Sequence, residues 1–78
     1  MAADISSIHE HMEVVGSDGQ HVGTVDHIDG SRIKLTKSDR ASGGRHHMIP
    51  TDWVQSADGT VRLNKPAQEA ISEWEAGE

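Results

Sequence analysis

The sequence predicts a small all-β domain, a barrel or sandwich of mainly antiparallel strands, with one short C-terminal α-helix. Turn signals recur at nearly regular intervals, and they include the Asp-Gly dipeptides at positions 18–19, 29–30 and 58–59. Asp-Gly is typical of hairpin turns, because Gly accepts a positive φ without a Cβ clash and Asp bonds its own backbone. The runs between these turns are short and β-prone, and the apolar spacing becomes helical only near the C-terminus. A chain of 78 residues is expected to fold as a single domain over 1–78.

Six β-prone runs follow one another along the chain. They cover residues 13–16, 21–28, 31–37, 46–49, 53–57 and 60–63. The third alternates most cleanly, since Ile33 and Leu35 share one face. Pro50 is expected to end the fourth strand, because proline has no N–H to give to the ladder. In the second, Val22 and Val25 are an odd distance apart, so Gly23 is expected to host a bulge or to let a neighbouring chain pass close.

The period of the apolar residues changes near the C-terminus, which predicts a helix over about 66–75. The residues on its apolar stripe are Ala67, Ala70, Ile71 and Trp74. Asn64 is the candidate N-cap, and Pro66 suits the first turn. Trp74 is expected to anchor the helix on the strands.

The ends of the chain and one internal segment are expected to be its most flexible parts. These are residues 1–4, residues 76–78 and the loop 37–45, which contains no large apolar residue. Ahead of the first strand, Ile5, Ile8 and Met12 have a spacing compatible with a short helical turn. Ser7-x-x-Glu10 resembles a capping box there, while an extended segment is the alternative.

Composition narrows the function classes. The formal net charge is −6, which disfavours nucleic-acid binding, although the basic stretch 32–45 leaves an RNA-associated role open. The chain has no Cys, which excludes disulfides, a thiolate nucleophile and a Cys-based zinc site. There is no apolar run long enough to insert into a membrane and no signal pattern, so we expect a cytoplasmic protein.

No catalytic residue and no cofactor motif stand out, so an enzyme is not expected. The Ser residues lie in turns rather than in a nucleophile elbow, and Asp26 and Asp29 flank a turn, where Asp is common. A His-based metal site, in a binding protein or a small metalloenzyme, is the alternative. His9 and His11 would face the same way in an extended segment, and His46 is the candidate further ligand.

The candidate binding surface comprises Arg45, His46, His47 and Trp53, which follow the expected mobile loop. His46 and His47 are adjacent, so on a strand they would point to opposite faces. Trp53 has two interpretations. It is a residue type enriched at interface anchors, and in a chain with so few aromatic residues it is also a candidate for the core.

Taken in order, several motifs resemble PRC-barrel domains. Residues 15–26 (VGSDGQHVGTVD) look like the opening hairpin of these domains. The motifs that continue the resemblance are Ile33-Lys34-Leu35-Thr36, His46-His47-x-Ile49-Pro50, Trp53-Val54 and Gly59-x-Val61-x-Leu63. The whole set is most similar to an uncharacterised bacterial family, domain of unknown function 2171, over residues 8–74.

This resemblance implies a PRC-barrel-like β-barrel of about six strands. Related barrels occur in the photosynthetic reaction-centre H subunit and in a ribosome maturation factor, where they act as docking modules. We therefore expect a non-enzymatic binding or assembly module, whose partner is another protein or a second copy in a homodimer. The second alternative, beside the metal site, is docking to RNA or the ribosome.

Overall fold

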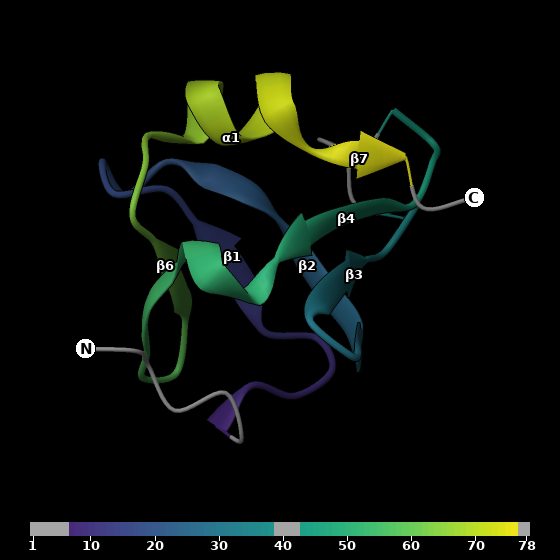
Figure 1. Ribbon diagram of the computed structural model, residues 1–78, viewed down its shortest axis with the longest axis horizontal. Helices are drawn as coiled ribbons and strands as arrows, with labels where there is room; N and C mark the ends of the chain where they lie inside the picture. The colour runs from purple at the N-terminus through teal and green to yellow at the C-terminus, as the bar shows by residue number, and fades with distance from the viewer. Residues whose placement is uncertain (1–6, 39–42, 77–78) are drawn as a thin grey trace.

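The computed structural model describes residues 7–38 and 43–76 (Figure 1). The strands are β1 (Glu13–Val15), β2 (His21–Asp29), β3 (Arg32–Leu35), β4 (His47–Pro50), β5 (Val54–Ala57), β6 (Val61–Leu63) and β7 (Glu75–Ala76). A 3-10 turn, η3 (Thr51–Trp53), joins β4 to β5, and one helix, α1 (Ala67–Glu73), follows β6. The prediction of a small, mostly β domain with a short C-terminal helix is confirmed. The expected flexible residues 1–4 and the tip of the expected mobile loop, 39–42, lie outside the described residues.

The strands form one mixed sheet in the order β5-β6-β1-β2-β3-β4-β7. The long strand β2 pairs with β1 along its first half and with β3 along its second half. β1 pairs with β6 in parallel, with Val14 opposite Val61, whereas the other pairings between described strands are antiparallel. Among the described residues β5 and β7 are the two edges of this order, so these pairings do not close a barrel.

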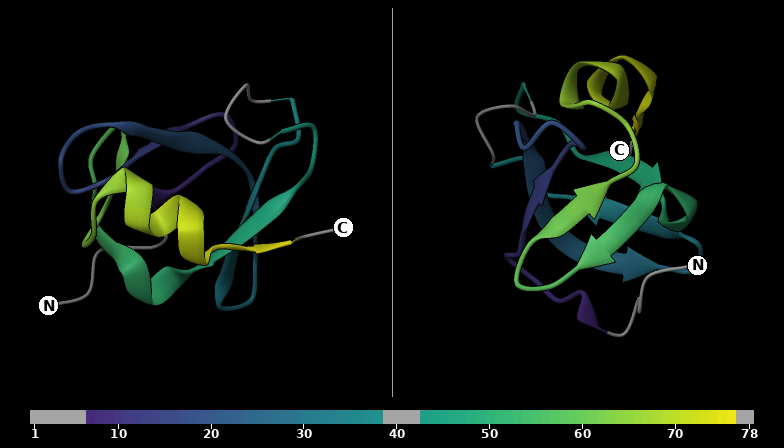
Figure 2. Two further views of the ribbon diagram at one scale, coloured as in Figure 1. Left: turned by 90° about the horizontal axis from the view of Figure 1, so that it is seen from above. Right: turned by 90° about the vertical axis from the view of Figure 1, so that its left-hand side faces the viewer.

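The core lies inside the curl of this sheet, and α1 crosses one end of the strands (Figures 1 and 2). The largest fully buried side chains come from five strands, and they are Val14, Val22, Val25, Ile33, Leu35, Ile49, Val61 and Leu63. The alternation predicted for Ile33 and Leu35 of β3 is thus confirmed, and Val61 and Leu63 of β6 point inward in the same way. None of the helices in the described part of the chain is both long and apolar enough to span a bilayer.

The bulge predicted at Gly23 is present in β2, one residue earlier. Val14 pairs with Gly23 but Val15 pairs with His21, so Val22 is an extra residue in β2 and forms a bulge. The bulge allows Val22 and Val25 both to be fully buried. A Cβ on Gly23 would lie 3.1 Å from Cδ1 of Leu35, so a neighbouring strand also passes close.

Three expected boundaries were wrong. Pro50 is the last residue of β4, opposite Arg32, because the ladder bond that follows is made by the N–H of Thr51 to the Ser31 carbonyl oxygen at 2.9 Å. Trp53 lies in η3 rather than in the fifth strand. Ala76, expected in a flexible end, belongs to β7, which pairs with His47 and Met48 at the edge of the sheet.

The helix begins without the N-cap that the sequence predicts. Pro66 occupies the N-cap position, and no side chain of that residue caps the helix. The Asn64 side-chain amide instead donates to the Asp52 carbonyl oxygen at 3.4 Å. Ala67 and Ala70 bury the helix against the strands, while Trp74 follows α1 as its C-cap and is only half-buried.

The described part of the segment before β1 contains Ser7 in a 3-10 conformation and a short turn at Glu10 and His11. The N–H of Met12 donates to the His9 carbonyl oxygen at 3.4 Å, and Ile8 and Met12 are buried. Ile5, the other member of the expected apolar spacing, lies outside the described residues.

Candidate functional site

The structure separates the four residues that the sequence places on one candidate surface. His46 lies beside Asp26 of β2, His47 packs on Trp74 after α1, and Trp53 lies beneath Lys65. Arg45 is exposed in the turn before β4. The adjacent imidazoles of His46 and His47 therefore contact different parts of the fold, and two candidate sites result in place of one.

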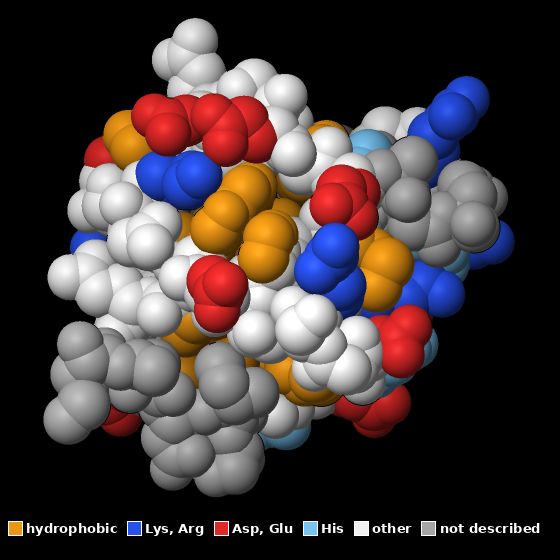
Figure 3. Space-filling view, in the orientation of Figure 1, with side chains coloured by type: hydrophobic (Ala, Val, Ile, Leu, Met, Phe, Trp, Pro, Cys, Tyr) orange, Lys and Arg blue, Asp and Glu red, His pale blue; other side chains and the backbone are white. Residues whose placement is uncertain are grey.

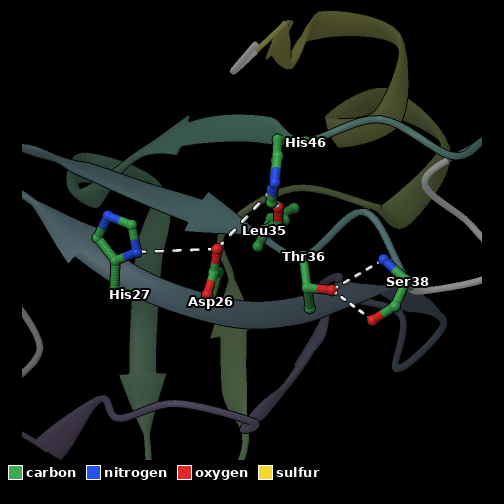
Figure 4. Close-up of polar contacts among 6 residues, drawn as sticks. All are labelled: Asp26, His27, Leu35, Thr36, Ser38 and His46. Carbon is green, nitrogen blue, oxygen red and sulfur yellow. Dashed lines mark hydrogen bonds and ion pairs between the residues drawn. The ribbon is translucent and has the colours of Figure 1, made fainter.

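The first candidate site contains Asp26 between two imidazoles (Figure 4). Oδ2 of Asp26 lies 3.8 Å from Nδ1 of His46 and 3.8 Å from Nδ1 of His27. His46 Nδ1 also lies 3.1 Å from the Leu35 carbonyl oxygen, which can only accept, so this nitrogen carries the hydrogen. His46 is thereby fixed by the backbone of β3, with its Nδ1 on the side of the Asp26 carboxylate.

An open hollow of about 570 Å³ lies along β2, next to Asp26. We refer to it as the β2 pocket, and its lining residues are His11, Glu13, His21, Thr24, Val25, Asp26, Thr36 and Ser38. Two carboxylates, two imidazoles and three hydroxyls line it, with Val25 as the sole apolar lining residue.

Hydrogen bonds within the β2 pocket hold its polar groups in place. The Glu13 carboxylate accepts from His21 Nδ1 at 2.9 Å, since a carboxylate has no hydrogen of its own to donate. The Thr36 and Ser38 hydroxyl oxygens are 2.6 Å apart, and the N–H of Ser38 donates to Oγ1 of Thr36 at 2.9 Å. The pocket thus has ordered walls contributed by β1, β2 and the segment after β3.

His11 stands at one end of the β2 pocket in a left-handed conformation, with φ of 72°. Its N–H donates to the Val25 carbonyl oxygen at 2.8 Å, while the N–H of Val25 donates to the Met12 carbonyl oxygen at 2.9 Å. His11 and Met12 thus both face Val25, which is the geometry of a β-bulge whose first residue, His11, has a left-handed conformation. A residue with a Cβ rarely adopts this φ, so the bulge holds the His11 side chain at the pocket under strain.

The histidines of the metal alternative do not come together. The segment that carries His9 and His11 turns at Glu10 and His11, so the extended geometry that would align the two imidazoles is absent there. His9 Nδ1 donates to the Glu10 carbonyl oxygen at 3.0 Å, and His46 is held beside Leu35. Within residues 7–38 and 43–76, no three His, Asp or Glu side chains are grouped in a way that could hold a metal ion.

The second candidate site lies around Trp53, beside α1. Nζ of Lys65 lies 4.0 Å from the centroid of the Trp53 ring, a cation–π contact. The same ammonium donates to the Glu73 carboxylate at 3.1 Å and lies 3.9 Å from Glu69. Trp53 is half-buried and packs against the core, so its ring is partly in the core and partly at the surface.

Trp74 extends the same surface at the other end of α1. Its ring stacks on the His47 ring, with the centroids 3.8 Å apart and the planes inclined by 13°. Figure 3 shows hydrophobic side chains gathered between α1 and η3, with acidic and basic side chains on both sides of them. The half-buried residues Trp53, Ile71 and Trp74 define what we call the α1 face.

Sequence reasoning found Trp53 and His47 but missed Ile71 as a surface residue and missed the β2 pocket. The helical stripe marks Ile71 as apolar, and only the packing shows that the two alanines, not Ile71, are the buried part of that stripe. The pocket depends on the pairing of Glu13 with Thr24, which brings residues of β1 beside the polar face of β2. That register could be proposed from the first Asp-Gly turn and from the odd spacing of Val22 and Val25, but the bulge at His11 and Met12 has no sequence pattern of its own.

Comparison with known proteins gives one family. Residues 8–71 match the model of the family described as "Uncharacterized protein conserved in bacteria (DUF2171)". Neither a curated protein nor a solved structure matched the chain.

Proposed function

The chain belongs to the bacterial family DUF2171, and we propose that it is a non-enzymatic assembly module that pairs with a second copy of itself through the α1 face. The observation that carries the proposal is the partly exposed apolar surface of Trp53, Ile71 and Trp74. Tryptophan is enriched among the residues that dominate interface energies. Both tryptophans of this chain belong to the α1 face.

The size of the domain supports the same proposal. A core built on 78 residues supplies little net stability, and association is one ordinary way of burying more apolar surface. The chain exposes 4492 Å², and a standard interface covers about 800 Å² on each partner. An interface of that size extends beyond three side chains and includes the charged residues around them.

The charges around the α1 face favour a second copy as the partner. On one side Lys65 pairs with Glu73, and on another Arg32 pairs with Glu75 at 3.3 Å. A two-fold dimer brings the same surface of both copies together, so a rim that carries both signs can complement itself. A rim of one sign would repel its own copy.

The resemblance to PRC barrels supports docking as the role, and it leads us to propose a PRC-barrel-like fold. We also propose the cytoplasm as the compartment, because a chain without Cys gains nothing from an oxidising one. The RNA alternative is disfavoured by the pairing of Arg32 with Glu75, which neutralises part of the basic stretch. The metal alternative is disfavoured by the separation of His9 and His11 from His46.

The proposal is tested by the oligomeric state of the chain and of two matched variants. Sedimentation equilibrium over micromolar concentrations is expected to give a dimer for the wild type and a monomer for Ile71→Glu. Ile28→Glu is the control, because Ile28 is also half-buried against the core but lies on β2. This control is expected to remain a dimer, since it changes the same residue type outside the α1 face.

Two results would contradict the proposal. One is a wild-type chain that remains monomeric at a concentration of about 1 mM, because its dissociation constant would then be too high for a specific assembly. The other is equal dissociation of Ile71→Glu and Ile28→Glu. Circular dichroism establishes that each variant is folded, and Trp53→Leu, which keeps an apolar side chain, provides a second variant of the same face.

A further inference from the structure

We propose that the β2 pocket binds a small aliphatic diamine, with one ammonium group on the Glu13 carboxylate and the other on the Asp26 carboxylate. This site is separate from the α1 face and does not depend on dimerisation. The pocket has an appropriate size, since its volume of about 570 Å³ lies within the range of small-molecule sites.

The charges of the lining residues select a cation. Glu13 and Asp26 are the charged groups of the lining when the imidazoles are neutral, and no Lys or Arg is among the lining residues. An anion would meet two carboxylates without a compensating cation, whereas an ammonium group makes charge-assisted hydrogen bonds with them. The net charge of −6 attracts cations to the whole molecule as well.

The strand register sets the backbone separation of Glu13 and Asp26. Glu13 of β1 pairs directly with Thr24 of β2, and Asp26 follows Thr24 by two residues. Diagonal neighbours of this kind on an antiparallel pair have Cα atoms roughly 7–8 Å apart, and rotation of the Glu and Asp side chains allows a similar distance between their carboxylates. A chain of four carbons between two amino groups spans such a separation, so 1,4-diaminobutane is the probe that fits best.

The neighbouring imidazoles leave part of the hydrogen-bonding capacity of both carboxylates unused. His21 holds one oxygen of Glu13 at 2.9 Å, and the side chain of Glu13 remains 52% exposed. The two imidazoles next to Asp26 are both 3.8 Å away, which exceeds a hydrogen-bond length. Each carboxylate therefore has an oxygen that can accept from an ammonium group.

The remaining lining residues favour an amine over the other small cations and polar ligands. A metal ion would need three grouped ligands, and the described residues provide no such group. A sugar is usually held on an aromatic ring, and neither tryptophan lines the pocket. The hydroxyls of Thr24, Thr36 and Ser38 provide acceptor oxygens beside the carboxylates.

The test is a titration of the isotope-labelled chain with 1,4-diaminobutane, followed through its backbone amide resonances. We expect saturable one-to-one binding that shifts the amides of residues 11–13, 21–26 and 36–38. The monoamine 1-aminobutane, which can reach only one carboxylate, is expected to bind about tenfold more weakly. This comparison uses the wild type alone, so it does not depend on the folding of a variant.

Variants of equal charge change separate the pocket from general attraction to an acidic protein. Glu13→Gln and Asp26→Asn are each expected to weaken diamine binding about tenfold, whereas Asp58→Asn, in the β5–β6 turn, leaves it unchanged within about twofold. The proposal is overturned by the absence of saturation at about 10 mM diamine, by equal binding of the monoamine, or by equal weakening in Asp58→Asn.

Discussion

The Asp18 carboxylate, in the turn between β1 and β2, accepts a hydrogen bond from the backbone N–H of Ala67, the first residue of α1, at 3.3 Å. The same oxygen accepts from the N–H of Gln20 at 3.2 Å. The helix therefore obtains its cap from a residue 49 positions away rather than from the residue that precedes it. One Asp thus stabilises a hairpin turn and orients the helix that supports the α1 face.

Asp18→Ala is expected to lower the free energy of unfolding by about 1 kcal/mol, because it removes the cap of α1. For a domain of this size that corresponds to a fall in melting temperature of about 4–8 °C. Asp29→Ala is the control, since Asp29 precedes Gly30 in a similar turn that lies at the β2–β3 connection. Thermal unfolding of both variants checks the prediction, which fails if they lose the same stability.

Gly16→Ala is expected to lower the free energy of unfolding by about 1–3 kcal/mol, because the new methyl group cannot be accommodated. A Cβ on Gly16 would lie 2.2 Å from the backbone nitrogen of Ala67, so α1 would have to move. Gly23→Ala is the matched comparison, where the Cβ would lie 3.1 Å from the end of the Leu35 side chain. Since a side-chain end can give way, Gly23→Ala should cost less, and the reverse order in urea unfolding would contradict this packing.

His11→Gly is expected to be more stable than His11→Ala by about 1 kcal/mol, because only glycine adopts a φ of 72° without a steric cost. Both variants lose the imidazole, so their difference reports the backbone alone. At His9, where the backbone φ is not positive, the alanine variant is expected to be more stable than the glycine variant, since glycine loses more chain entropy on folding. Chemical unfolding of the four variants provides the measurement, and the same order at both positions would argue against a strained bulge.

One equivalent of zinc is expected to change the melting temperature by less than about 1 °C at neutral pH, after chelation of any bound metal. Binding to the folded state would raise the melting temperature by mass action, and His9, His11 and His46 do not form a common site. A stoichiometric rise that is lost in His11→Ala would contradict this prediction and favour the metal alternative.

The parts of the fold that depend on local chemistry were predictable. The three Asp-Gly turns place Gly19, Gly30 and Gly59 at positive φ, as expected of hairpin dipeptides. The alternation around Ile33 and the helical stripe from Ala67 likewise identified buried positions. These signals act within a few residues, so the sequence displays them directly.

The parts that depend on contacts between distant segments were not predictable. The parallel pairing of β1 with β6, the strand β7 and the cap that Asp18 provides each join residues far apart in the chain. His46, His47 and Trp53 were expected on one candidate surface, but they contact Asp26, Trp74 and Lys65, which come from different parts of the chain. Neighbours in the sequence therefore belong to different sites.

The most direct measurement of the proposed assembly is an isotope-filtered nuclear Overhauser experiment on a mixture of labelled and unlabelled chains. Only contacts between copies produce signals in this experiment. The proposal predicts intermolecular signals from Ile71 and from the Trp53 and Trp74 rings. Signals confined to other residues, such as Ile28 on β2, or no intermolecular signals at all, would contradict it.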